Sequence, residues 1–163
     1  MTLVPETERL GTWGGVRKYL RQYHTDTFVV SNGDQLTDID ISKLVEFHRE
    51  KGALVTLGTV EVDTPHEYGV LESDRHGKVI AFYYKPEHPP TNFVMAGVYI
   101  AEPEVFGLGP ETDYLSFEEN ILPLIIKLER LYECRAGGRW HDCGTFKRYE
   151  DAIRDWTGKT AAA

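Results

Sequence analysis

The chain has 163 residues, of which 41% are apolar and 27% are charged, and its formal net charge is −8. This length predicts one domain with a sizeable hydrophobic core, and the composition is that of an ordinary globular protein. The acidic balance argues against a nucleic-acid partner, which would favour a basic face. It does not exclude a phosphorylated ligand, because a metal ion and one lysine can offset phosphate charge locally.

Cysteine usage and the lack of targeting patterns indicate where the protein works. The two cysteines, Cys134 and Cys143, lack the C-x-x-C spacing of redox or zinc sites. A thiol-reducing cytoplasm is therefore the simplest location. The first residues lack a secretory pattern, and no apolar run approaches the length that spans a bilayer, so we expect neither secretion nor membrane insertion.

Helical and strand patterns alternate along the chain, as is typical of α/β proteins. Helices are predicted at residues 14–23, 41–51, 117–128 and 145–156. Strands are predicted at residues 27–31, 53–62, 68–72, 79–84, 93–100 and 131–134. Asp40 or Ser42 is expected to cap the second helix, which ends at Gly52, and the turn at 74–77 closes a hairpin. We expect one domain over residues 1–157 and a disordered tail over 158–163.

Two aspartates follow or precede glycines at the ends of predicted elements. The first ends the segment Phe28-Val29-Val30-Ser31-Asn32-Gly33-Asp34, and the second lies in Arg139-Trp140-His141-Asp142-Cys143-Gly144-Thr145. A plain turn explains either segment alone, because Asn-Gly and Gly-Asp pairs are common turn chemistry. Acids at strand ends also point into the crevice where open α/β sheets bind ligands. Together, Asp34 and Asp142 could hold one divalent cation, and we expect them to approach each other.

Six ordered segments carry a family resemblance that spans nearly the whole chain. They are Glu8-Arg9-Leu10-Gly11-Thr12-Trp13-Gly14-Gly15, Asn32-Gly33-Asp34, Glu67-Tyr68-Gly69-Val70-Leu71-Glu72, Tyr84-Lys85-Pro86, Met95-Ala96-Gly97-Val98-Tyr99 and Trp140-His141-Asp142-Cys143-Gly144-Thr145. In this order and approximate spacing, the chain resembles the sugar-phosphate nucleotidyltransferases. Within that family it looks most like the guanylyltransferases that act on mannose or heptose phosphates.

The resemblance implies a fold, a reaction and two substrates. The implied fold is a Rossmann-like mixed, mainly parallel sheet flanked by helices, of the nucleotide-diphospho-sugar transferase type. The implied reaction joins a nucleoside triphosphate, with GTP favoured, to a sugar 1-phosphate and releases pyrophosphate. Asp34 and Asp142 match the two family aspartates that bind Mg²⁺, and hard carboxylate oxygens are the ligands that this cation prefers.

Further site residues follow from the same resemblance. Lys85 matches the lysine that contacts the phosphate of the sugar, although a solvated surface lysine would look the same. The nucleotide-binding matches are Gly11, Thr12, Asn32 and Gly33. The sugar-binding matches are Gly69, Tyr84, Lys85, Met95, Gly97 and Tyr99. Gly69 could equally open a hairpin without any ligand, and Tyr99 could equally be a core residue.

Strand alternation gives one further expectation for the hairpin end. Neighbouring side chains in a strand point to opposite faces. We therefore expect Lys85 to face the same crevice as Asp34, and Tyr84 to turn away from it or to stack on a ligand.

The sequence also departs from the family pattern. It contains no G-G-x-G-T-R-L-x-P-L-T loop, which in the family cradles the triphosphate and supplies the catalytic arginine. The chain thus resembles the second portion of such a domain, truncated at the N-terminus and lacking a central strand. Tyr84, Met95 and Trp13 stand where the family usually has a glutamate, an asparagine and a small residue.

Two other polar residues and two functional hypotheses remain open. His141 could bind a metal or act as a base, and Cys143 could be a nucleophile, but neither has the partners that such chemistry uses. The chain is either a nucleotidyltransferase or a non-catalytic sugar-nucleotide binding or regulatory subunit. Its missing strand predicts a partner, either a second copy in a homo-oligomer or a complementing N-terminal segment.

Overall fold

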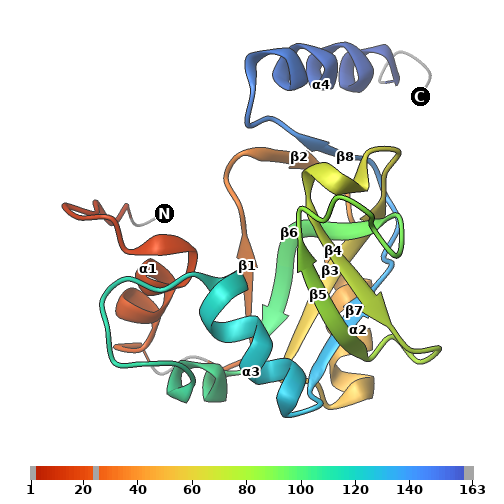
Figure 1. Cartoon of the computed structure of the whole chain (residues 1–163). Coiled ribbons are helices and arrows are strands. Elements are labelled where there is room, and N and C mark those ends of the chain that lie inside the picture. Colours follow the sequence, from red (N-terminus) through yellow and green to blue (C-terminus); the bar gives the residue numbers. More distant parts are fainter. Residues whose placement is uncertain (1–2, 24–25, 160–163) are drawn as a thin grey trace.

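Runs of β-branched and aromatic residues form a six-stranded sheet at the centre of the computed structural model, which describes residues 3–23 and 26–159 (Figure 1). The strands are β1 (Phe28–Ser31), β3 (Val55–Glu61), β4 (Gly69–Ser73), β5 (Val79–Tyr84), β6 (Phe93–Ala101) and β7 (Leu131–Cys134). Their order is β5-β4-β6-β3-β7, and β1 pairs with β6 beside this path.

The mixed α/β fold expected from the sequence is confirmed, but the balance of strand directions differs from a mainly parallel sheet. Among the described strands, only β3 and β7 pair in parallel, while β6 runs antiparallel to β1, β3 and β4. The reason is connectivity. Strands β4 and β5 are joined by a short turn, which connects only antiparallel neighbours, and the longer loop over residues 85–92 carries the chain past β4 to β6, which pairs antiparallel with β4.

Helices cover both faces of the sheet. They are α1 (Gly11–Leu20), α2 (Ile41–Lys51) and α3 (Leu122–Lys127), whereas α4 (Phe146–Lys159) lies away from this sheet; a π-helical turn lies at Phe117–Ile121 and 3₁₀ turns at Pro65–Glu67 and Pro103–Gly107. Trp13 of α1 and Phe117 pack in one buried cluster, which also includes Ile125 of α3. Leu44 of α2 packs in a second cluster, with Val98 and Ile100 of β6. The sheet is therefore the middle of three layers.

The second helix matches its prediction closely. It spans Ile41–Lys51, and the Asp40 carboxylate accepts hydrogen bonds from the backbone N–H groups of Ser42 and Lys43 at 3.0 and 3.2 Å. Gly52 ends it with a φ of 56°, a left-handed conformation that glycine adopts without strain.

Other helix boundaries differ from the expectations. Helix α1 begins at Gly11, three residues earlier than predicted. The backbone of Leu115 lies where a side chain at position 11 would be, which accounts for the glycine. The helix expected at 117–128 divides into the π-helical turn and α3. Helix α4 continues to Lys159, so residues 158 and 159 are helical rather than part of a tail. The remainder of the expected tail, 160–163, lies outside the described residues.

A separate two-stranded sheet, not predicted from the sequence, lies beyond one end of the main sheet (Figure 1). It pairs β2 (Gln35–Thr37) with β8 (Trp140–Asp142) in antiparallel register, with Gln35 opposite Asp142. Helix α4 follows β8 and lies on the outer side of this small sheet. The pairing brings together two segments that are more than a hundred residues apart in sequence. Among the described residues, no helix is both long and apolar enough to span a membrane.

Candidate active site

A cavity of about 330 Å³ opens between the small β2–β8 sheet and the main sheet. Many of its lining residues come from segments singled out in the sequence. Those predicted site residues that line it are Asn32, Asp34, Gly69, Tyr84, Lys85, Met95, Gly97 and Asp142. They derive from five separate stretches of the chain. The fold thus gathers most of the candidate residues around one space.

The two aspartates lie side by side, as expected. The backbone N–H of Cys143 donates to the carbonyl oxygen of Asp34 at 2.8 Å, which ties the residue after β8 to the residue before β2. A Cβ on Gly144 would lie 2.9 Å from Oδ1 of Asp142 and 3.9 Å from Oδ2 of Asp34, so both carboxylates border the same glycine. Sequence reasoning placed Asp34 at the end of the preceding strand, whereas the structure places it in the turn immediately before β2.

Arg148 forms the strongest polar contacts of the Asp142 carboxylate. Its guanidinium donates to Oδ2 of Asp142 at 2.6 Å and also pairs with Glu67. The guanidinium carbon lies 5.2 Å from the centre of the Tyr68 ring. Burial raises the pKa of the Tyr68 hydroxyl, and the charges of Asp142 and Glu67 raise it further against the lowering effect of Arg148. This phenol is therefore protonated at neutral pH.

Lys85 faces the cavity, as predicted, but Tyr84 does too. The Nζ of Lys85 lies 5.5 Å from the centre of the Tyr84 ring, which is the geometry of a cation–π contact. Of the two alternatives given for Tyr84, turning away is therefore excluded and stacking on a ligand stays a prediction, because β5 ends at Tyr84 and Lys85 has a φ of 46°, outside the strand conformation. Strand alternation therefore does not apply across this pair.

Glycines and one indole shape the floor of the cavity. Gly97 has a φ of 64°, and a Cβ there would overlap the side-chain amide of Gln35, so only glycine fits this position. The Trp140 Nε1–H contacts Oε1 of Gln35 at 3.2 Å and the carbonyl oxygen of Ala96 at 3.0 Å. These hydrogen bonds fix the small sheet against β6, and the buried Gly97 lies in the lining of the cavity.

Four predicted binding residues do not line the cavity. Tyr99 is only 4% exposed, and its ring stacks on Phe117 with centroids 4.4 Å apart, so it belongs to the core. Gly11 is explained by the adjacent Leu115 backbone, and Gly33 lies in an exposed turn between two lining residues.

Thr12 is the fourth of these residues, and it contacts a residue that lines the cavity without lining it itself. Its hydroxyl accepts from the Phe117 backbone N–H and donates to Oε2 of Glu118, both at 2.8 Å. Glu118 itself lines the cavity, so Thr12 holds a wall residue in place without facing the space.

Sequence reasoning missed seven lining residues, which are Gln35, Glu67, Tyr68, Phe82, Glu118, Trp140 and Arg148. Three of them lie inside quoted motifs, namely Glu67, Tyr68 and Trp140, and Gln35 directly follows another. Arg148 could have been found from its place in the first turn of the helix after Asp142. Glu118 gave no such signal, because acids at a helix start are explained by the helix dipole alone.

The charge of the lining fits a divalent cation bound together with phosphate. Four acids, Asp34, Glu67, Glu118 and Asp142, face two bases, Lys85 and Arg148. Among the described residues, no group of three or more acids, histidines and cysteines is arranged to hold a metal by itself. Mg²⁺ does not need such a group, since it commonly binds through one or two carboxylates and completes its shell with water and substrate phosphates.

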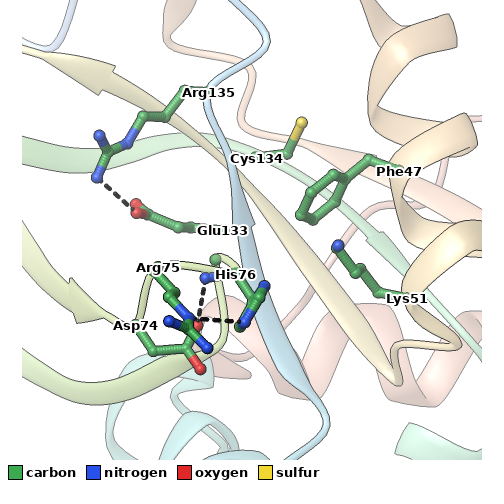
Figure 2. A pocket seen from close by; sticks show the side chains of 9 residues that line it. Phe47, Lys51, Asp74, Arg75, His76, Glu133, Cys134 and Arg135 are labelled. Carbon is green, nitrogen blue, oxygen red and sulfur yellow. Dashed lines mark hydrogen bonds and ion pairs between the residues drawn. The ribbon is translucent and has the colours of Figure 1, made fainter.

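A second cavity, of about 440 Å³, lies between α2, the β4–β5 turn and β7 (Figure 2). None of the predicted site residues lines it. Its acids are occupied with holding the structure. Oδ1 of Asp74 accepts from the backbone N–H groups of His76 and Lys78 at 2.8 and 2.9 Å. Glu133 is 4% exposed and accepts from Ser73 at 2.5 Å and from Arg135 at 2.9 Å.

Comparisons with known proteins show the family to which this chain belongs. The sequence pattern of the nucleotidyl transferase family matches residues 1–159. The chain is 35% identical over 153 residues to a mannose-1-phosphate guanylyltransferase of Mycobacterium tuberculosis, covering 93% of this chain and 42% of that protein. It is 34% identical over 152 residues to a UTP–glucose-1-phosphate uridylyltransferase of Synechocystis, covering 89% and 39%.

A solved structure of another protein has a similar fold. HddC from Yersinia pseudotuberculosis superposes with a TM-score of 0.76 at 26% identity, covering 93% of this chain and 64% of that one. The chain spans about two fifths of the length of the two curated relatives.

Proposed function

Because the chain belongs to the nucleotidyl transferase family, we propose that it forms the sugar-phosphate and metal site of an enzyme that makes a nucleotide sugar. The substrates are a nucleoside triphosphate, with GTP favoured, and a sugar 1-phosphate, and pyrophosphate is the second product. The observation that carries this proposal is the convergence of Asp34, Lys85 and Asp142, from three distant segments, on one cavity. Asn32 lies beside them on the same wall.

Each side chain has a role that its chemistry suits. In the reaction, a phosphate oxygen of the sugar 1-phosphate attacks the α-phosphorus, a new P–O bond forms, and the bond to the bridging oxygen breaks to release pyrophosphate. Lys85 would bind the attacking phosphate, and its position over Tyr84 limits where its ammonium group can point. The backbone around Gly69 and Gly97 would contact sugar hydroxyls.

Asp34 and Asp142 would hold a magnesium ion at the edge of the same cavity. When bound, this ion neutralises the charge of the phosphate oxygens. Two carboxylates on adjacent strands, one of them held by the Gly144 N–H at 2.7 Å, suit such a ligand pair.

We further propose that this polypeptide alone does not release pyrophosphate. Nucleotidyl transfer depends mainly on positioning and electrostatic stabilisation, and the sequence contains no glycine-rich loop to cradle the triphosphate. Among the described strands, β1 pairs only with β6, so its other edge can accept a strand. A second copy or a complementing N-terminal segment would fill that edge. A cytoplasmic location is consistent with such a reaction.

A thermal-shift experiment tests the binding half of this proposal. GDP-mannose with Mg²⁺ should raise the melting temperature of the wild-type chain, because a ligand that binds only the folded state stabilises it by mass action. UDP-glucose and ADP-glucose are compared to identify the preferred base. The shift should disappear in Asp34→Asn and shrink in Lys85→Ala, while exposed Asp63→Asn and Lys127→Ala serve as controls. Equal shifts in all variants would refute the assignment of the site.

A pyrophosphate-release assay separates catalysis from binding. No release from GTP and mannose 1-phosphate is expected for the chain alone. Turnover that disappears in Asp34→Ala would show that this polypeptide is a competent enzyme. Binding without turnover, even with a complementing segment added, would favour the alternative of a regulatory sugar-nucleotide binding subunit.

A further inference from the structure

Arg148 lies between Asp142, which is one of the two candidate metal ligands, and Glu67. Its guanidinium joins Oδ2 of Asp142, at 2.6 Å, to the carboxylate of Glu67, which also lines the cavity. The side chains are 32%, 18% and 41% exposed for Arg148, Asp142 and Glu67, so the pair with Asp142 is partly shielded from water. Such a pair is stronger than an exposed one because it is screened less.

The guanidinium and a divalent cation would compete for the same carboxylate. Oδ1 of Asp142 accepts from the Gly144 N–H, and Oδ2 accepts from Arg148, so both oxygens already have donors. A cation bound at Asp142 would lie beside the positive guanidinium, which is unfavourable for both. Among the residues that the structure describes, no Lys, Arg or His forms an ion pair with Asp34, whereas Arg148 pairs with Asp142.

The helix that carries Arg148 lets its side chain move without unfolding. The Arg148 N–H donates to Oγ1 of Thr145 at 3.3 Å, which fixes the backbone of the first turn of α4. Farther along the helix, Trp156 packs against Arg139, with the guanidinium carbon 3.8 Å from the ring centre. His141 also lies 3.6 Å from the Asp155 carboxylate. Helix α4 therefore stays attached to β8 when Arg148 releases Asp142.

We propose that Arg148 is a built-in counter-ion of Asp142, a positioning residue that holds this carboxylate toward the cavity and leaves it when a divalent cation binds. This inference rests on the proposed function, which supplies the cation. When a cation has replaced the guanidinium at Asp142, Arg148 keeps Glu67 as its partner and stays at the cavity wall. The device holds the ligand pair in place while preventing tight binding of a cation before substrate phosphate arrives.

Mn²⁺ affinity, measured by the electron paramagnetic resonance of free Mn²⁺, tests this proposal without any need for turnover. Arg148→Met should bind Mn²⁺ roughly fivefold or more tightly than wild type, because a competing cation has been removed. Arg148→Lys, which keeps the charge but cannot bridge two carboxylates as a fork, should lie between them. Lys147→Met is the matched control, since Lys147 is an exposed neighbour outside the cavity. Circular dichroism verifies that each variant is folded.

The outcomes distinguish this inference from the proposed function. A gain in Mn²⁺ affinity in Arg148→Met alone supports it, because a merely structural residue would give a loss when removed. Equal affinity in wild type and Arg148→Met, or weaker binding in the variant, overturns the counter-ion role but leaves the metal site intact. Absence of Mn²⁺ binding in every folded variant overturns the metal site and this inference together.

Discussion

The cavity around Asp34 and the cavity beside Asp74 have similar sizes but use their charges differently. In the larger one, of about 440 Å³, Asp74 and Glu133 accept hydrogen bonds from backbone and side-chain donors that hold the β4–β5 turn against β7 (Figure 2). In the smaller one, of about 330 Å³, acids and bases from distant segments meet across the space itself. Charge arrangement, rather than volume, therefore indicates which cavity binds a ligand. The predictions below test this difference.

The largest expected effect is the loss of cation binding in Asp142→Asn. Removing a ligand charge should weaken Mn²⁺ binding by more than about 100-fold, a larger loss than outer partners of a metal site give. The free energy of unfolding should fall by no more than about 1 kcal/mol, because the lost ion pair is partly exposed. Spin resonance of free Mn²⁺ and urea denaturation measure the two quantities. If Asp142→Asn bound Mn²⁺ as tightly as wild type, the charges of the first cavity would have no more of a binding role than those of the second.

The opposite pattern is expected for Glu133→Leu in the second cavity. This carboxylate is buried and binds both Ser73 and Arg135, so its loss should lower the free energy of unfolding by about 1–3 kcal/mol. Mn²⁺ affinity should not change. Urea denaturation provides the measurement, with exposed Glu87→Leu as the control. Normal stability combined with weaker Mn²⁺ binding would reverse the roles that we assign to the two cavities.

A smaller effect is expected for Lys85→Ala in the first cavity. Loss of one charged hydrogen-bond donor should weaken mannose 1-phosphate binding about tenfold, with Mn²⁺ affinity unchanged. Titration calorimetry in the presence of Mg²⁺ gives the affinity. Lys51→Ala, in the second cavity, is the matched control and should bind the sugar phosphate as wild type does. Equal losses in both variants would argue for a general charge effect.

The smallest expected effect concerns the pH dependence of stability through Asp74. Hydrogen bonds from the backbone N–H groups of Lys78 and His76 hold the pKa of this carboxyl below its ordinary value of 3.8. A lowered pKa in the folded state stabilises the protein above the ordinary value, and this contribution is lost as the pH falls through the lowered one. The stability difference between wild type and Asp74→Asn should therefore be constant near neutral pH and shrink below 3.8.

Acid denaturation of both proteins, with exposed Asp63→Asn as the control, measures this difference. A gap that widens at low pH would contradict the role of the turn hydrogen bonds.

Local chemistry made much of the fold predictable. Helix α2 was predicted to the residue because Asp40 caps it and Gly52 ends it. The hairpin of β4 and β5 followed from apolar runs around a glycine turn. Strands β2 and β8 were not predictable because each has three residues and is defined by pairing across more than a hundred residues. The direction of neighbouring strands was likewise set by connections rather than by strand composition.

The site was predictable where motifs ended in charged residues, and less so elsewhere. Asp34, Lys85 and Asp142 were identified, and all three line one cavity. The shared orientation of Tyr84 and Lys85 was missed because the positive φ of Lys85 cannot be read from strand alternation. Arg148 was missed although it lies in the first helical turn after Asp142, because its second partner, Glu67, is 81 residues away in the sequence.

The central claim is that a divalent cation and a sugar phosphate bind together in the cavity around Asp34, Lys85 and Asp142. Phosphorus NMR of mannose 1-phosphate in the presence of Mn²⁺ tests it most directly, because the paramagnetic ion broadens only nearby nuclei. Wild-type chain should increase the broadening beyond that of Mn²⁺ alone, and Asp142→Asn should abolish the increase. Equal broadening with the wild-type chain and with Asp142→Asn would contradict this account of the site.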